Sequence, residues 1–198
     1  MNIMEKLAAR ISELKNPTVA GLDTRIEYLP ESFVAEVLPE GIRSFEDAAK
    51  AVYAYNVRLI DALYDIVPAV KVQVAYYEMY GPAGMEVYEK TIRYAQEKGL
   101  IVMADVKRND IGATAACYAN AYIGKTDMPD GAQGAKGTDI AGCFDANGNG
   151  AIVNASRSIL CAWKKREGMA FDAAARDEAL RMKQDLCDSL AAVGKAIK

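Results

Sequence analysis

The 198-residue sequence contains no histidine, and this absence removes several classes of catalytic chemistry. Triads that pair serine or cysteine with histidine, zinc sites of the H-E-x-x-H type, and acid–base catalysis by imidazole are all excluded. The proton transfers and charges of an active site must therefore come from aspartate, glutamate, lysine and arginine.

Cysteine is sparse as well, with four residues at Cys117, Cys143, Cys161 and Cys187. None of them forms a C-x-x-C pair, so we expect neither a zinc site nor a disulfide framework. Reduced thiols of this kind are typical of a cytoplasmic protein.

Long hydrophobic runs and an excess of basic residues are also missing. No apolar run approaches the roughly 20 residues that span a bilayer, and residues 1–15 lack the apolar segment of a signal peptide. The formal net charge is −3, which gives no basic footprint for nucleic acid. We therefore expect a cytoplasmic protein that binds neither membranes nor nucleic acid. With 52% hydrophobic residues, residues 1–198 are expected to form a single α/β domain.

Short apolar runs alternate with amphipathic segments along the chain. The apolar runs predict buried strands at residues 18–22, 69–73, 100–104 and 150–153. The amphipathic segments predict helices at residues 3–15, 45–64, 111–122, 158–165 and 171–193, and a further helix from Pro82 to Gly99. Ser44 and Asp47 form a capping signature for the helix at 45–64. Strands separated by helices favour a parallel sheet of βαβ units.

The third apolar run leads into the most informative motif, D-x-K-x-x-D at Asp105, Lys107 and Asp110. Side chains two residues apart in a strand share a face, so Asp105 and Lys107 should project together from the strand end. Asp110 should follow on the turn into the next helix. Carboxylates on both sides favour the protonated ammonium of Lys107, which is then a well-placed acid. A surface salt-bridge cluster is the alternative, but α/β barrels carry their active sites at strand ends.

Residues 124–149 interrupt the alternation and predict no strand of useful length. The sequence Gly124-Lys125-Thr126 resembles the end of a phosphate-binding loop, but Ala119 stands where that motif requires glycine. Residues 145–152 resemble half of a calcium-binding EF-hand loop, but Ser156 occupies the position of its bidentate glutamate. We therefore expect neither nucleoside triphosphate nor calcium to bind here.

Four segments together resemble the orotidine 5'-phosphate decarboxylase family, in its bacterial subgroup with longer sequences. They are AGLD at 20–23, VKVQ at 70–73 with YE at 77–78, residues 105–114, and GAQG at 131–134 followed by GAIVNASRSI at 150–159. The resemblance implies a TIM-type (β/α)8 barrel. It also implies a reaction that removes CO2 from orotidine 5'-phosphate to give UMP, in pyrimidine biosynthesis, without metal or organic cofactor.

The resemblance assigns catalytic roles to four residues. Lys107 would protonate C6 as the carboxylate leaves, and Asp105 would lie against the substrate carboxylate. Lys71 and Asp110 would complete an alternating charge network. The chemistry of these residue types agrees, because loss of CO2 leaves an unstabilised carbanion for which a fixed ammonium is both electrostatic partner and proton source.

The resemblance also assigns substrate contacts. Asp23 would contact a ribose hydroxyl, and Gln133 and Arg157 would contact the phosphate. Arg157 stands just before a predicted helix, so its guanidinium and the N-terminal amides of that helix could share one phosphate. Thr114, like Asp110, would be supplied across the interface of a homodimer.

The chain is short for a complete barrel. A (β/α)8 barrel takes roughly 250 residues. Here the helix after the third strand is followed by the glycines of the phosphate loop within about ten residues, from Tyr122 to Gly131. Strands four to seven, and the Thr-Ser-Asn segment of the family, are therefore expected to be missing. Strands one, two, three and eight would form a contiguous four-stranded sheet, whose open edges and uncovered inner face would be liabilities.

Several explanations of this short chain stay open. An internal deletion could leave an inactive remnant, the sequence could lack residues that the native protein has, or two half-sheets could pair into an eight-stranded assembly. Three functions accordingly stay open. The chain could decarboxylate orotidine 5'-phosphate, or it could be a non-catalytic remnant that binds phosphate or dimerises. It could also be a related D-x-K-x-x-D barrel that catalyses a magnesium-dependent lyase reaction on a sugar phosphate. The match around Lys71 and Arg157 favours the pyrimidine enzyme.

Overall fold

A computed structural model describes residues 3–108, 114, 117–118, 121 and 151–197 of the chain. Within these residues, four parallel strands form one sheet in the order β3-β2-β1-β4. The strands are β1 (Thr18–Gly21), β2 (Ala69–Gln73), β3 (Ile101–Asp105) and β4 (Val153–Ala155). This order confirms the α/β fold with a contiguous sheet of strands one, two, three and eight of a barrel.

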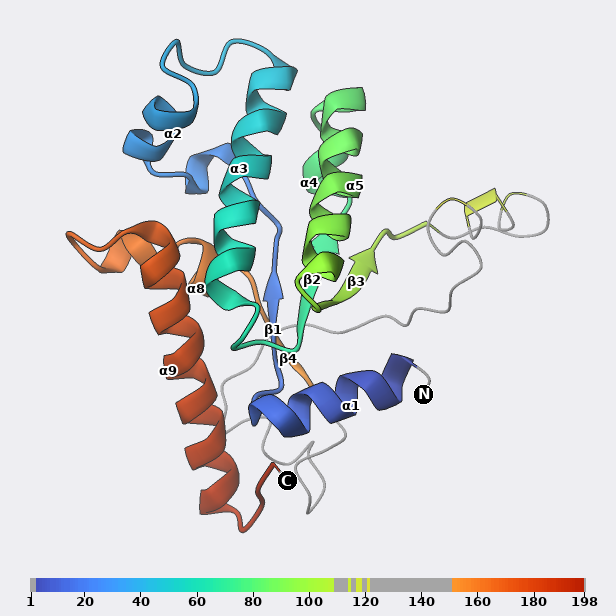
Figure 1. The fold of residues 1–198 in the computed structure, drawn as a ribbon, viewed down its shortest axis with the longest axis vertical. Coiled ribbons are helices and arrows are strands. Elements are labelled where there is room, and N and C mark those ends of the chain that lie inside the picture. Colours follow the sequence, from blue (N-terminus) through green and yellow to red (C-terminus); the bar gives the residue numbers. More distant parts are fainter. Residues whose placement is uncertain (1–2, 109–113, 115–116, 119–120, 122–150, 198) are drawn as a thin grey trace.

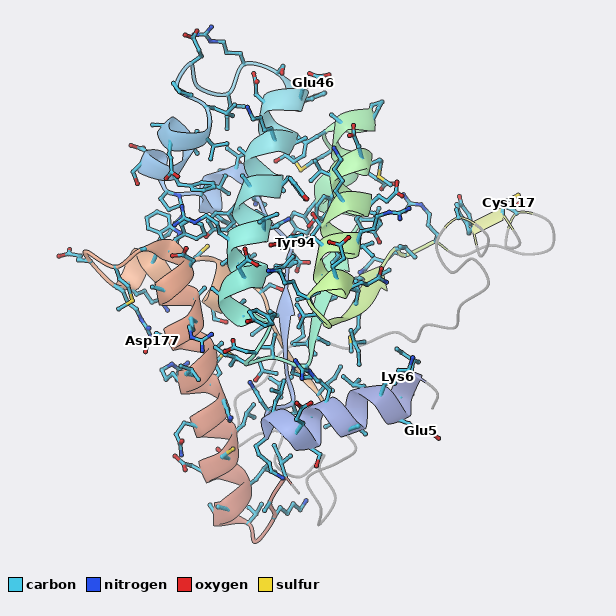
Figure 2. The ribbon with its side chains drawn as sticks, viewed as in Figure 1. Glu5, Lys6, Glu46, Tyr94, Cys117 and Asp177 are labelled. Atoms are coloured by element: carbon cyan, nitrogen blue, oxygen red, sulfur yellow. The ribbon has the colours of Figure 1, made fainter. Side chains whose placement is uncertain are left out.

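Among the described residues, helices join β1 to β2 and β2 to β3, and further helices precede β1 and follow β4. They are α1 (Ile3–Leu14), α2 (Glu31–Val37), α3 (Phe45–Leu63), α4 (Ala75–Glu78), α5 (Gly81–Glu97), α8 (Arg157–Leu160) and α9 (Phe171–Ala192), with short 3-10 turns η1 (Ile26–Tyr28) and η3 (Ala162–Lys165). The long helices α3 and α5 lie side by side, and α9 runs against α3 (Figure 1). Tyr94, labelled between α3 and α5 in Figure 2, links them by donating its hydroxyl to Asp61 Oδ1 at 2.8 Å.

The helix ends follow the expected capping residues. Ser44 Oγ accepts a hydrogen bond from the Asp47 amide at 3.1 Å, and Asp47 Oδ2 accepts one from the Arg43 amide at 3.0 Å. Pro82 lies in the first turn of α5, and Gly99, with φ of +80°, follows its last turn. The predicted starts and ends of α3 and α5 are therefore confirmed.

Two elements near the C-terminus differ from the expectation. The strand predicted at 150–153 is β4, which starts at Val153 because its register with β1 pairs Thr18 with Val153 and Ala20 with Ala155. The apolar run begins before the first residue that pairs with β1, so it marks the strand but not where its pairing starts. The single helix predicted at 158–165 is instead α8 followed by η3, which are separated at Cys161. The helix predicted at 111–122 lies mostly outside the described residues.

The two faces of the sheet pack against different partners. Val70 and Val72 belong to the main core, together with the buried side chains of α3 and α5. Val19 and Ala69 belong to a separate cluster with Leu7 of α1. Helix α1 crosses below β1 in Figure 1, at the N-terminal ends of the strands. The inner face was expected to be uncovered. That expectation is wrong for the N-terminal half of the strands, because α1 covers this part of the face.

The described residues also bear on the cysteines and on membrane binding. Cys117, Cys161 and Cys187 are free thiols, and Cys143 lies outside the described residues. In the part of the chain that the structure describes, no helix has both the length and the apolar character needed to cross a membrane.

Candidate active site

Charged side chains meet at the C-terminal edge of the sheet. Lys71 lies on β2, Asp105 ends β3, and Asp23 comes two residues after β1. The parallel register pairs Gly21 with Lys71, and Gln73 with Asp105. Because the C-terminal ends of parallel strands share one edge, three separate segments deliver their charges to a single place.

These side chains form a chain of alternating charge. Lys71 Nζ donates to both oxygens of Asp23, at 2.6 and 2.8 Å, and lies 3.6 Å from Asp105 Oδ2. The other oxygen of Asp105 accepts a hydrogen bond from Lys107 Nζ. The order is therefore Lys107, Asp105, Lys71 and Asp23. The side chains of Lys71 and Asp23 are only 15% and 16% exposed, whereas that of Lys107 is 63% exposed. The ammonium at this outer end is the one that a ligand can reach.

Lys107 reaches Asp105 by a different route from the one expected. Strand β3 ends at Asp105, and Lys107 has a φ of +45°, in the left-handed region. The two side chains therefore meet where the chain leaves the strand and do not share a strand face. This conformation costs a residue other than glycine roughly 1–3 kcal/mol, and such strain concentrates at functional sites. The next residue, Arg108, forms an ion pair with Glu78 of α4, which anchors the segment.

Two further side chains complete this network, and the sequence analysis missed both of them. Gln73 Oε1 accepts a hydrogen bond from Lys107 Nζ at 3.0 Å. Strand alternation could have found it, since Gln73 lies two residues from Lys71 on β2. Ser156, between β4 and α8, donates its hydroxyl to Asp23 Oδ2 at 2.8 Å. Gly21 makes room for it, because a Cβ at this position would lie 1.8 Å from Ser156 Oγ.

The remaining predicted residues are not part of the contacts described above, or they lie outside the described residues. Arg157 is exposed and is the first residue of α8, and Thr114 is exposed. Asp110 and Gln133 lie outside the described residues. The structure thus brings together Asp23, Lys71, Asp105 and Lys107 of the eight predicted residues. The described residues hold no group of three or more cysteine or acidic side chains that could bind a metal.

The chain is similar to curated proteins over part of its length. Residues 45–132 match the orotidine 5'-phosphate decarboxylase / HUMPS family. An orotidine 5'-phosphate decarboxylase from Clostridium botulinum is 42% identical over 121 residues, which are 61% of this chain and 40% of that protein. One from Caldicellulosiruptor saccharolyticus is 36% identical over 128 residues, which are 65% and 42% of the two chains. The chain therefore spans about two fifths of the length of the curated relatives it matches.

Two solved structures share the fold at low sequence identity. A structure assigned as an orotidine 5'-phosphate decarboxylase from Streptomyces avermitilis matches with a TM-score of 0.68 and 19% identity, over 96% of this chain and 98% of that one. Another, assigned as an orotidine-monophosphate decarboxylase from Toxoplasma gondii, matches with a TM-score of 0.72 and 15% identity, over 98% of each chain. Over these residues the chain is thus similar in sequence to the orotidine 5'-phosphate decarboxylase / HUMPS family, and the two solved structures show that it shares their fold.

Proposed function

We propose that this chain decarboxylates orotidine 5'-phosphate to UMP. The observation that carries the proposal is the alternating chain of Lys107, Asp105, Lys71 and Asp23 at the C-terminal edge of a parallel sheet. Each ammonium in it is bound by a carboxylate, so the charges are oriented before a substrate arrives. Such preorganised charges stabilise a transition state without reorganising during the reaction.

In the proposed reaction the bond between C6 and the carboxylate carbon breaks, CO2 leaves, and the electron pair stays on C6. The exposed ammonium of Lys107 then gives a proton to C6 and forms the new C–H bond. Asp105 and Gln73 hold this ammonium from two sides, which fixes the direction of its third N–H. A positioned acid of this kind typically contributes 10²–10⁴-fold to a rate.

Asp105 has a second proposed part in the reaction. Its carboxylate would lie beside the carboxylate of the substrate, and the repulsion between the two negative charges would be relieved as CO2 leaves. Lys71, 3.6 Å from the same group, holds Asp105 in place together with Lys107. Asp110 would extend the network.

The other predicted residues would bind the rest of the nucleotide. We propose that Asp23 contacts a ribose hydroxyl, and that Arg157 and Gln133 contact the phosphate. We also propose a homodimer, in which Asp110 and Thr114 serve the site of the partner. The exposed side chain of Thr114 is compatible with this role. Light scattering coupled to size exclusion tests the assembly, and a monomer at assay concentration would contradict it.

The decisive experiment follows the loss of orotidine 5'-phosphate by ultraviolet absorbance, with the purified 198-residue chain and with Lys107→Ala prepared identically. We expect turnover by the chain that Lys107→Ala abolishes and that a metal chelator leaves unchanged. Turnover no greater than the background of the variant would contradict the proposal. Restoration of chelated activity by magnesium would indicate a metal-dependent lyase instead.

A non-catalytic role is the second candidate. The observation that favours it is that the chain spans about two fifths of its curated relatives. Calorimetric titration with UMP and with inorganic phosphate distinguishes the two. Binding of either ligand by a chain that does not turn over substrate would favour the non-catalytic role.

A further inference from the structure

A chain of buried hydrogen bonds runs behind the site, between the end of β1 and helix α3. The hydroxyl of Tyr77, on α4, donates to the carbonyl of Leu22 at 3.0 Å. Asn56 of α3 donates its Nδ2 to the Tyr77 hydroxyl at 3.0 Å. The Oδ1 of Asn56 accepts from Thr24 Oγ1 at 2.6 Å. Thr24, Asn56 and Tyr77 are fully buried. The network therefore ties both neighbours of Asp23 to two helices.

The cost of this network indicates that it does more than fill space. A buried polar side chain is costly unless its hydrogen bonds are made, and apolar residues would fill the same volume without that cost. Burial raises the pKa of the Tyr77 phenol, so the hydroxyl keeps its proton and remains a donor. A satisfied buried network of this kind rigidifies the backbone to which it binds.

The backbone that it holds is the segment that presents Asp23. The amide of Leu22 donates to the carbonyl of Lys71 at 2.7 Å, while its own carbonyl accepts from Tyr77. Leu22 is thus fixed on both sides, and Thr24 is fixed by its side chain. The carboxylate between them has little freedom to move away from Lys71, which it binds with both oxygens.

We propose that Tyr77, Asn56 and Thr24 are positioning residues that fix the orientation of Asp23 and, through it, of Lys71. The proposal rests on the function proposed above for this site. All three side chains are fully buried, so we do not expect them to contact a substrate. If Asp23 is released, Lys71 is free to turn towards Asp105 and disturb the group that holds Lys107. Substitution of one of these three residues is therefore expected to lower kcat/KM by more than its loss of stability would explain.

The test compares two buried phenols by the ultraviolet assay. Tyr55 is the matched control, because it is also fully buried and its hydroxyl donates to a backbone carbonyl, that of Leu160. We expect both Tyr77→Phe and Tyr55→Phe to lower the melting temperature, Tyr77→Phe somewhat more because its hydroxyl also accepts a hydrogen bond from Asn56. We expect kcat/KM to fall about tenfold in Tyr77→Phe and less than twofold in Tyr55→Phe, because misplacement near reacting groups is costly. In an Asp23→Ala background, Tyr77→Phe should have no further effect on kcat/KM.

A second measurement needs no turnover. The ammonium of Lys71 gives a ¹H–¹⁵N NMR signal when hydrogen bonds slow its proton exchange, and the signal is assigned by its loss in Lys71→Met. We expect Tyr77→Phe to broaden this signal and Tyr55→Phe to leave it sharp. Thr24→Val should also broaden it, whereas Thr24→Ser, which keeps the hydroxyl, should retain it.

The outcomes separate the two proposals. A sharp signal in Tyr77→Phe and Thr24→Val would overturn the positioning role, and so would equal kcat/KM in the two phenylalanine variants of an active chain. An inactive wild-type chain in which Tyr77→Phe still broadens the Lys71 signal would refute decarboxylation while the orientation of Asp23 by the network stands.

Discussion

The two ends of one face of the sheet have opposite character. Towards the N-terminal ends of the strands, Val19 and Ala69 pack against Leu7 of α1. Two residues further along β2, Lys71 belongs to the charged network, with Asp105 on the next strand. The same strands thus provide a buried apolar end and a partly exposed charged end. Burial stabilises the fold, whereas fixed charges serve chemistry, so substitutions at the two ends should have opposite signatures.

The largest effect is expected at the charged end. Asp105→Asn keeps the shape of the side chain but removes the charge that Lys71 and Lys107 share. We expect kcat to fall about 10³-fold, the upper range for loss of a preorganised electrostatic group, with a nearly unchanged melting temperature. The ultraviolet assay and a thermal melt measure both. Asp188→Asn, on the exposed face of α9, is the control and should change neither.

An activity loss below tenfold in Asp105→Asn would remove the distinction between the two ends. It would mean that the charged network is a structural ion cluster, as the alternative explanation of the D-x-K-x-x-D motif holds.

The apolar end should show the reverse. Leu7 is 4% exposed, and Leu7→Ala is expected to lower the free energy of unfolding by about 2–4 kcal/mol through lost burial and the cavity that it leaves. Turnover per folded molecule should stay the same. Urea unfolding with the assay measures both quantities. Met4, on the same helix, is 54% exposed, and Met4→Ala should change stability by no more than about 0.5 kcal/mol. Equal losses in the two variants would mean that α1 does not contribute through burial.

Substitution of Gly21, which is next to the site, should lower both stability and activity, each by less than the two variants above. A Cβ at this position would lie 1.8 Å from Ser156 Oγ, so Gly21→Ala must displace that hydroxyl from Asp23. We expect a loss of about 1–3 kcal/mol in stability together with reduced kcat/KM. Adding Ser156→Gly removes the two nearest atoms and should recover most of the stability but not the activity. If Ser156→Gly does not recover the stability, the loss in Gly21→Ala comes from the backbone of β1 and not from the clash with Ser156.

Local pattern was sufficient to predict Asp105 and Lys107, because they follow an apolar run with strand character, whereas Lys71 was predicted from the family resemblance. It could not predict the contact between Ser156 and Asp23, since 133 residues separate them and the pairing of β1 with β4 brings them together. The left-handed φ of Lys107 was equally out of reach, because lysine gives no local signal for it.

The packing of α1 illustrates the same limit. Its amphipathic pattern predicted a helix, but the partner of its apolar face depends on which side of the sheet the chain crosses. The buried network of Thr24, Asn56 and Tyr77 was missed for a related reason. Each residue type is common on its own, and only the packing of α3 against the end of β1 makes the three a unit.

The smallest effect is expected where charge lies on the surface, far from the site. Arg176 of α9 binds both oxygens of Asp65, which follows α3, at 2.6 and 2.9 Å. These hydrogen bonds hold the pKa of Asp65 below its usual range. A carboxyl with a lowered folded-state pKa stabilises the fold above its unfolded-state pKa, about 3.9, and the contribution is lost as the pH falls through the folded-state value.

Arg176→Met should therefore lower stability by about 0.5 kcal/mol at pH 7, a typical value for an exposed pair, and by less at pH 3. Urea unfolding at the two pH values measures the difference, and high salt should reduce it at pH 7. An equal loss at both values would mean that the guanidinium acts through its other hydrogen bond, to the carbonyl of Ala62, and not through charge. A small, salt-sensitive contribution would show that this surface ion pair adds little to stability. That result would support the comparison of the two ends of the sheet, in which the charged end serves chemistry and the apolar end serves stability.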